Sequence, residues 1–124
     1  MRHMDKAVTD QFYADIQAMA KEISNCEFTF VNTVAKYSTP CDPALIDTID
    51  HVCTRLNISH IIMPSGAGHD ANPMAHEGVP IGMVFVPSVK GISHHGDEWT
   101  DPKHIDLGAD VLYETVLALD KTDL

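Results

Sequence analysis

The sequence has few basic residues, few cysteines and no long hydrophobic run. Its 124 residues contain 8 Lys and Arg against 18 Asp and Glu, which gives a formal net charge of −10. A surface this acidic repels phosphate groups, so we expect neither nucleic acid nor an anionic membrane as a partner. No apolar run approaches the roughly 18 residues that a membrane-spanning helix needs, so we expect no membrane insertion.

Other absences concern export and disulfides. Residues 1–6 are not followed by the apolar region of a secretory signal. The three cysteines, Cys26, Cys41 and Cys53, include no CxxC pair, and we expect buried free thiols rather than disulfides. The hydrophobic fraction of 44% and the charged fraction of 21% are those of an ordinary globular chain with a single core. Together these features predict a soluble, cytoplasmic protein.

Four segments have the sequence pattern of a helix. Two of them begin with Asp-Pro, which places a capping carboxylate before a proline in the first turn. Another repeats apolar residues at spacings of three and four. The predicted helices are residues 5–24, 42–57, 69–75 and 101–121, with Asp5, Asp42 and Asp101 as predicted N-caps.

Three segments rich in apolar or β-branched residues lie between these helices and have the pattern of strands. Strands that alternate with helices predict an α/β fold, in which a sheet has flanking helices. In such sheets the loops at the carboxyl ends of strands hold the functional residues. The predicted strands are residues 26–36, 58–63 and 80–87, and the last two precede loops that contain histidine.

The first of these loops, residues 65–71, places Gly66 and Gly68 just before His69 and Asp70. Glycine at two of three positions permits positive φ or a close approach of the backbone to a ligand, but the phosphate-binding glycine patterns are absent. A histidine at a helix N-terminus suits hydrogen bonding to a developing oxyanion, or metal ligation. The alternative is that Asp70 caps the helix beside a structural His69.

The second loop, residues 91–99, contains His94, His95, Asp97 and Glu98. Imidazole and carboxylate groups are the ligands that zinc and manganese prefer. Side chains of adjacent residues diverge, so we expect only one of the two histidines to bind a metal. The alternative is a solvated acidic loop with no metal.

The two loops together resemble one family. Residues 63–71 contain GAGHDA, residues 83–88 read Met-Val-Phe-Val-Pro-Ser, residues 91–94 read GISH, and Glu98 follows. In order and spacing these segments resemble the C-terminal part of the zinc-dependent amidohydrolases. That group includes N-carbamoyl-L-amino acid hydrolase, allantoate amidohydrolase and β-ureidopropionase, within the aminoacylase-like binuclear metallopeptidases. The resemblance covers essentially the whole chain.

The resemblance implies roles for four residues. His94 would ligate one of two metal ions, which are zinc or, in its place, manganese or cobalt. His69 would polarise the scissile carbonyl and stabilise charge on the tetrahedral intermediate, with Gly68 against the substrate. Arg2 would bind the substrate carboxylate, as the Arg of a family pattern Asp-x-Arg-His. The Asp of that pattern has no counterpart in this sequence.

The resemblance also implies an organisation and an activity. Residues 1–40 would be the C-terminal part of a lid or dimerisation domain, and residues 41–124 that of the catalytic domain. The activity would be metal-dependent hydrolysis of linear C–N amide bonds in N-carbamoyl amino acids or allantoate-like substrates. The other metal ligands and the general-base Glu have no counterpart here, so we expect the chain alone to bind no metal and to be inactive.

Several alternatives stay open for the chain as a whole. In the first, the chain is part of an amidohydrolase, as a truncated gene product or as one half of a split enzyme whose partner chain carries the missing half. In the second, it is a non-catalytic remnant that associates with itself, because a piece of a sheet exposes strand edges and apolar faces. A third hypothesis is a mononuclear metal site built from His69, His94 and nearby carboxylates. The expected partners are a second copy of the chain and a small-molecule substrate.

Overall fold

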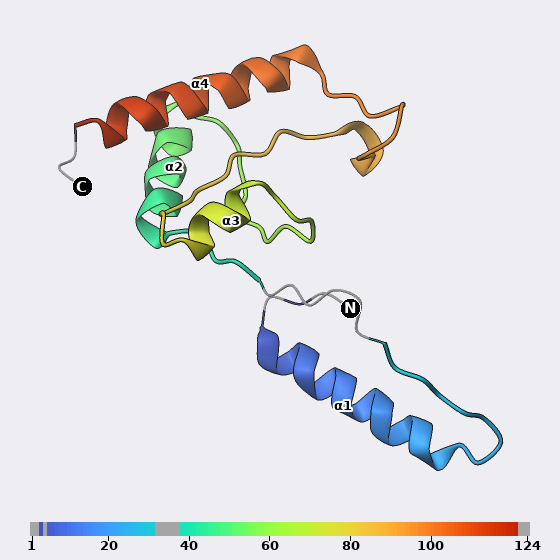
Figure 1. Ribbon diagram of the computed structural model, residues 1–124. Helices are drawn as coiled ribbons and strands as arrows, with labels where there is room; N and C mark the ends of the chain where they lie inside the picture. Colours follow the sequence, from blue (N-terminus) through green and yellow to red (C-terminus); the bar gives the residue numbers. More distant parts are fainter. Residues whose placement is uncertain (1–2, 4, 32–37, 122–124) are drawn as a thin grey trace. The chain divides into compact units, whose positions relative to one another are not determined.

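The structure is a computed structural model that describes residues 3, 5–31 and 38–121 (Figure 1). Its contacts divide the chain into two units. The first unit comprises Met1–Pro40 with Pro64–His69, and the second comprises Cys41–Met63 with Asp70–Leu124. The assignment of residues 1–40 to a lid domain and of residues 41–124 to a catalytic domain stays a prediction.

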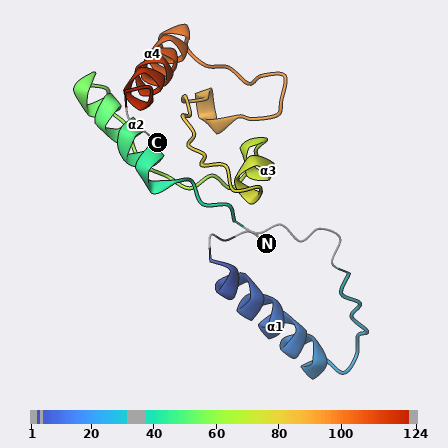
Figure 2. The same ribbon diagram turned by 60° about the vertical axis from the view of Figure 1, so that its left-hand side comes forward.

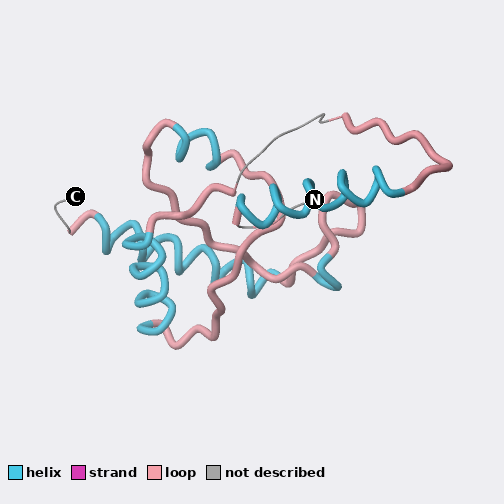
Figure 3. The backbone as a smooth tube through the Cα atoms, turned by 90° about the horizontal axis from the view of Figure 1, so that it is seen from below, coloured by secondary structure: helices cyan, strands magenta, loops and turns pink. Residues whose placement is uncertain are grey.

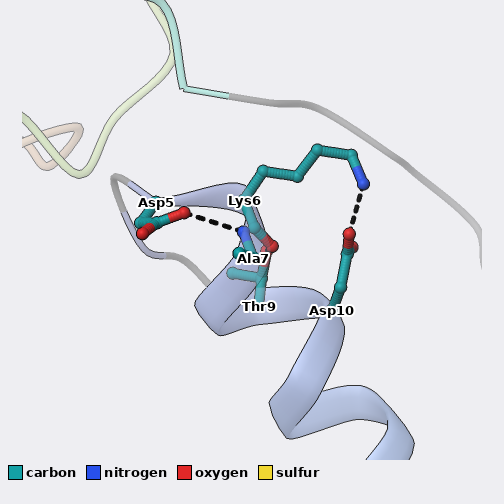
Figure 4. Close-up of polar contacts among 5 residues, drawn as sticks. All are labelled: Asp5, Lys6, Ala7, Thr9 and Asp10. Atoms are coloured by element: carbon teal, nitrogen blue, oxygen red, sulfur yellow. Dashed lines mark hydrogen bonds and ion pairs between the residues drawn. The ribbon is translucent and has the colours of Figure 1, made fainter.

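Helix α1, Lys6–Glu22, is the helix of the first unit. The carboxylate of Asp5 accepts a hydrogen bond of 2.8 Å from the backbone N–H of Ala7 and caps the helix as predicted. Lys6 forms an ion pair with Asp10 one turn later (Figure 4). No residue of α1 is buried.

The chain after α1 remains in contact with that helix through one aromatic pair. The rings of Tyr13 and Phe30 meet edge to face with their centroids 6.0 Å apart. Residues 26–31 are nevertheless a loop, where the sequence predicts a strand over 26–36. Residues 32–36 of that predicted strand lie outside the described residues.

Helices α2 (Pro43–Arg55) and α4 (Pro102–Leu119) begin where the two Asp-Pro pairs predict. The carboxylate of Asp42 accepts hydrogen bonds from two backbone N–H groups in the first turn of α2. That of Asp101 accepts one of 3.0 Å from the backbone N–H of Lys103. This hydrogen bond favours the carboxylate and lowers the pKa of Asp101.

Helix α2 ends two residues before the predicted boundary at residue 57. Asn57 lies two residues past the helix and has a left-handed φ of 55°. The backbone N–H of Asn57 donates to the carbonyl of Thr54 at 3.0 Å, and that of Ile58 donates to the carbonyl of Cys53 at 2.9 Å. These bonds satisfy carbonyl groups that the helix end would leave without partners.

Helices α2 and α4 pack against each other and form the core of the second unit (Figure 2). Val52 and Cys53 of α2 and Val111 of α4 are buried, each at most 5% exposed. On the surface, Nη2 of Arg55 lies 2.7 Å from Oε2 of Glu114 and joins the two helices. Partly buried apolar residues surround this core: Ile49, Leu56, Ile58, Val84 and Ala118.

Two short helices connect the longer ones. They are α3, Ala71–His76, and the 3-10 helix η1, Val89–Gly91. Helix α3 begins two residues after the predicted start at residue 69. Gly78, with a φ of 84°, ends this segment, and its N–H donates to the carbonyl of Ala75 at 3.0 Å.

The segments predicted as strands at residues 58–63 and 80–87 are loops in the structure (Figure 3). One backbone hydrogen bond of 2.8 Å, from Asp42 N–H to the carbonyl of Ile81, ties the second segment to the start of α2. A strand needs a neighbour in hydrogen-bonding register, and none of the described residues supplies one. Ile61 is 78% exposed, although such a side chain is typical of a buried strand. The predicted sheet is therefore unconfirmed.

The three cysteines are free, as predicted, but only Cys53 is buried. The expectation of burial is wrong for Cys26, which is exposed, because the described first unit has no buried core around it. Burial raises the pKa of the Cys53 thiol, so it remains protonated and unreactive. No described helix is both long enough and apolar enough to span a membrane.

Candidate functional site

The first histidine loop is organised around Ser65. Its hydroxyl oxygen lies 2.7 Å from Nε2 of His69 and accepts a hydrogen bond of 3.2 Å from the backbone N–H of Ala67. This oxygen therefore ties the loop backbone to the imidazole. His69 itself is half-buried, which suits a ring that is oriented by the protein and still reachable by a substrate.

The two glycines of this loop lie in open space. A Cβ atom added to Gly66 or Gly68 would meet nothing within 4 Å, and neither glycine has a positive φ. Backbone conformation therefore does not require glycine at these positions in the structure. The place of Gly68 against a substrate stays a prediction.

Asp70 stands at the N-cap position of α3 but does not cap it. Its side chain makes no capping hydrogen bond, and its backbone is helical, with φ −64° and ψ −17°. The alternative interpretation of Asp70 as a cap is therefore wrong, since a capping residue has an extended backbone.

The second histidine loop is closed at its base by the backbone. Val89 N–H donates to the carbonyl of Trp99 at 2.9 Å, and the Ser88 hydroxyl donates to the carbonyl of Ile92 at 2.5 Å. These bonds fix where the loop leaves and re-enters the rest of the second unit. The Trp99 side chain is 56% exposed, and it is the backbone carbonyl of Trp99 that closes the loop.

His94 lies at the tip of this loop in a left-handed conformation with a φ of 55°. Its backbone N–H donates a hydrogen bond of 2.8 Å to Oε2 of Glu98. Glu98 N–H in turn donates to the carbonyl of His95 at 3.0 Å, which closes a tight turn. Two hydrogen bonds therefore fix the backbone that carries the predicted metal ligand.

The structure treats the two adjacent histidines differently. Nδ1 of His95 accepts a hydrogen bond of 3.1 Å from the backbone N–H of Asp97, so that nitrogen is committed to the loop. The Asp97 carboxylate is 3.5 Å from the same nitrogen, but an ion pair there would require a proton where the amide N–H already donates. The exposed imidazole of His94 has no such bond to the described part of the chain. Of the two rings, His94 is therefore the better placed to bind a ligand.

The sequence does not predict the contacts that Ser65 and Glu98 make, although it marks Glu98 as a possible metal-ligating carboxylate. Ser65 hydrogen-bonds to His69, and Glu98 hydrogen-bonds to His94. In each pair the two residues are four positions apart, and this spacing is the sequence feature that could have indicated the contacts. The ring of His60 is also held by a side chain, because its Nε2 lies 2.7 Å from Oδ1 of Asp50. This hydrogen bond is the main cause that raises the pKa of His60.

The predicted residues do not amount to a metal site. Within residues 3, 5–31 and 38–121, no three His, Cys, Asp or Glu side chains come together in a way that could hold an ion. A catalytic zinc needs about three protein ligands, so His94 alone does not fit one. The mononuclear alternative gains no support from the described residues. Arg2, the predicted carboxylate-binding residue, lies outside them.

An apolar depression on α1 is separate from these residues. It is lined by Ala7, Val8, Gln11, Phe12 and Asp15, none of which the sequence marks as functional. This depression carries no catalytic group of the predicted kind.

Sequence comparisons place the chain in one peptidase family. A profile of the peptidase family M20/M25/M40 matches residues 3–118. An N-carbamoyl-L-amino-acid amidohydrolase of Pseudomonas sp. strain NS671 is 38% identical over 105 residues, which cover 82% of this chain and 25% of that relative. The allantoate amidohydrolase of Escherichia coli strain K12 is 35% identical over 104 residues, which cover 81% of this chain and 25% of that relative.

A solved structure agrees with these relatives. The crystal structure of a protein described as an amidohydrolase/peptidase, from Burkholderia cenocepacia, superposes with a TM-score of 0.80 at 37% identity. The match covers 94% of this chain but 29% of the solved one. The chain therefore spans less than a third of the length of the relatives that it matches.

Proposed function

Since the chain belongs to the peptidase family M20/M25/M40, we propose that it forms the C-terminal portion of a metal-dependent amidohydrolase. The proposed substrates are N-carbamoyl amino acids or allantoate-like molecules, and the bond hydrolysed is a linear C–N amide bond. The supporting observation is that relatives named for these reactions match four fifths or more of the chain. The rest of the active site would be supplied by polypeptide outside these 124 residues.

The proposed roles divide between the two loops. His69, held by the Ser65 hydroxyl, would donate a hydrogen bond to the oxygen of the scissile carbonyl as charge develops on it. Gly68 would lie against the substrate, and Arg2 would bind its carboxylate. His94 would supply one imidazole ligand to a metal pair of zinc, manganese or cobalt. The described residues do not fit a complete metal site, so we derive no catalytic step through the metal.

Activity with and without the missing part tests this proposal. We expect the purified chain to hydrolyse no N-carbamoyl amino acid in the presence of zinc, manganese or cobalt. We expect turnover when the chain is co-produced with the part of the Pseudomonas relative that lies outside the matched 25%. His94→Ala should abolish that turnover, whereas His95→Ala, the matched change at the adjacent histidine, should leave most of it. No turnover in any combination would refute the hydrolase assignment, and turnover by the chain alone would refute its dependence on other polypeptide.

Metal content provides a second test that needs no substrate. Elemental mass spectrometry of the purified chain should find well under one metal ion per chain, because one imidazole does not hold a catalytic ion. About one ion per chain that is lost in His94→Ala would instead establish a self-sufficient site.

A non-catalytic, self-associating protein is the second candidate. The observation in its favour is the exposed apolar surface of the described residues, including Phe12 at 53%, Ile62 at 68% and Val116 at 56%. Such surfaces favour association. Light scattering after size exclusion would show a dimer or larger species under this candidate, with no turnover in the co-production experiment. A cytoplasmic location stays a prediction under both candidates.

A further inference from the structure

The backbone of His94 is strained in a way that needs a local cause. Its φ of 55° lies in the left-handed region, which residues with a Cβ atom rarely adopt. Strain of this kind persists only where neighbouring groups over-determine the conformation. Gly91, three residues earlier, also has a positive φ, of 66°, so His94 adopts a conformation that this loop otherwise gives to a glycine, although His94 carries a Cβ atom.

Glu98 provides the constraint. Its Oε2 accepts the backbone N–H of His94 at 2.8 Å, while its own N–H donates to the carbonyl of His95 at 3.0 Å. The two bonds involve the N–H of His94 and the carbonyl of His95, which flank the His94–His95 peptide bond. A hydrogen bond from an amide to a carboxylate is among the stronger hydrogen bonds in proteins.

The other carboxylate of the loop does not share this role. The side chain of Asp97 is 80% exposed, and the hydrogen bond that Asp97 makes comes from its backbone N–H to Nδ1 of His95. Glu98 is also adjacent to Trp99, whose carbonyl closes the loop by accepting the N–H of Val89 at 2.9 Å. The carboxylate that holds His94 is therefore the one attached to the fixed base of the loop.

We infer that Glu98 is a positioning residue for His94: its carboxylate holds the His94 N–H and keeps that residue in the left-handed conformation from which the imidazole is presented. The importance of this geometry for metal binding rests on the proposed function, in which His94 is a ligand. The effect of Glu98 on the backbone conformation of His94 does not depend on that function. Glu98 acts through the backbone and is not assigned as a ligand.

Amide exchange of the isotopically labelled full chain, without metal or substrate, tests the inference. In Glu98→Ala the His94 amide should exchange with water about tenfold faster, the factor that corresponds to the loss of about 1.4 kcal/mol. In Glu98→Gln the amide oxygen can accept the same N–H, so exchange should stay within about threefold of the parent chain. Asp97→Ala removes the neighbouring carboxylate and should leave exchange at His94 unchanged.

The strong intraresidue amide-to-Hα Overhauser effect of a positive φ gives an independent readout of the same variants. It should weaken in Glu98→Ala and persist in Glu98→Gln. The amide of Leu56, which bonds to the carbonyl of Val52 in α2, reports any general loss of folding. Unchanged exchange at His94 in Glu98→Ala, or an equal change in Asp97→Ala, would overturn the inference. A failure of the hydrolase proposal would leave these measurements unaffected.

Discussion

The hydroxyl oxygen of Ser65 lies 2.7 Å from Nε2 of His69, four residues later in the same loop. The backbone N–H of Ala67 donates to this oxygen at 3.2 Å, which leaves the hydroxyl proton available to the imidazole. A hydrogen bond donated to Nε2 places the proton of the neutral ring on Nδ1. If the hydroxyl donates to Nε2, Ser65 selects the Nδ1–H tautomer of the neutral His69 ring, whose Nδ1–H is then its hydrogen-bond donor.

Ser65→Ala should change the tautomer of His69. Without the hydroxyl, the neutral ring is expected to shift from the Nδ1–H form towards the Nε2–H form, which the ¹⁵N chemical shifts of the ring report directly. Ser65→Thr keeps a hydroxyl at this position and should keep the parent shifts. Ring shifts that do not differ between Ser65→Ala and the parent chain would show that Ser65 does not orient His69.

The helices could be predicted from the sequence because their signals are local. The carboxylates of Asp5, Asp42 and Asp101 cap the helices at the predicted starts, and Asn57 ends α2 as its residue type indicates. A cap depends on residues within one turn of itself, so its sequence signal is local, although Asp70 before α3 shows that a capping residue type does not cap every helix it precedes.

The sheet could not be predicted in the same way, because strand pairing depends on residues that are distant in the sequence. Residues 58–63 and 80–87 have the composition of buried strands, yet Ile61 and Phe85 are 78% and 50% exposed. Whether such a segment pairs depends on a neighbour that the described residues do not contain. The same limit applies to the metal site, for which this chain offers His94 but no cluster within its described part.

The identity of the candidate residues was easier to predict than their partners. Histidine and glycine in loops indicate candidate sites by residue type alone, because histidine binds metals and transfers protons and glycine permits close backbone approach. Ser65 and Glu98 instead act through hydrogen bonds to a ring nitrogen and to a backbone N–H, at 2.7 and 2.8 Å. Side-chain contacts between loop residues depend on the course of the backbone, which sequence periodicity does not report in loops.

Val111→Ala should strongly destabilise the second unit. Val111 is 3% exposed, in a described core whose buried hydrophobic residues are Val52, Cys53, Ile81 and Val111. Removing two methyl groups from such a site should lower the free energy of unfolding by about 2 kcal/mol. Val116 on the same helix is 56% exposed, so Val116→Ala should change the free energy of unfolding by less than about 0.5 kcal/mol. Urea denaturation followed by circular dichroism measures both, and equal effects would contradict the α2–α4 core.

Gly108→Ala should destabilise the chain although it lies in a helix. Alanine is favoured over glycine in a helix by about 1 kcal/mol. A Cβ atom at Gly108, however, would lie 2.6 Å from Cγ1 of Val86, and valine has little freedom to rotate. Overpacking of this kind costs about 1 to 3 kcal/mol, so we expect a net loss of stability.

Truncation of the opposing side chain separates the two effects at Gly108. In the Val86→Ala background the clash is removed, and Gly108→Ala should become neutral or stabilising, which urea denaturation measures as a coupling energy. Gly96→Ala serves as the control, since an added Cβ there meets nothing within 4 Å. If Gly108→Ala stabilises the parent chain, the segment that contains Val86 does not pack on α4.

The ion pair between His60 and Asp50 predicts a dependence of stability on pH. Nε2 of His60 lies 2.7 Å from the Asp50 carboxylate and Nδ1 lies 2.9 Å from the carbonyl of Ile58, so both nitrogens face acceptors and the charged ring is favoured. The hydrogen bond to Asp50 is the larger cause of the raised pKa of His60. A raised folded-state pKa means that the stabilisation is full below the unfolded value of about 6.5 and is lost as the pH rises through the folded pKa.

Proton NMR titration of the His60 ring measures this pKa directly. Asp50→Asn removes the carboxylate and should lower the pKa of His60 towards its ordinary value, while the loss of stability on raising the pH becomes smaller. Asp47→Asn changes a carboxylate on the same helix that does not bond to His60 and should leave the titration unchanged. An unaltered His60 titration in Asp50→Asn would show that the carboxylate does not stabilise the charged ring.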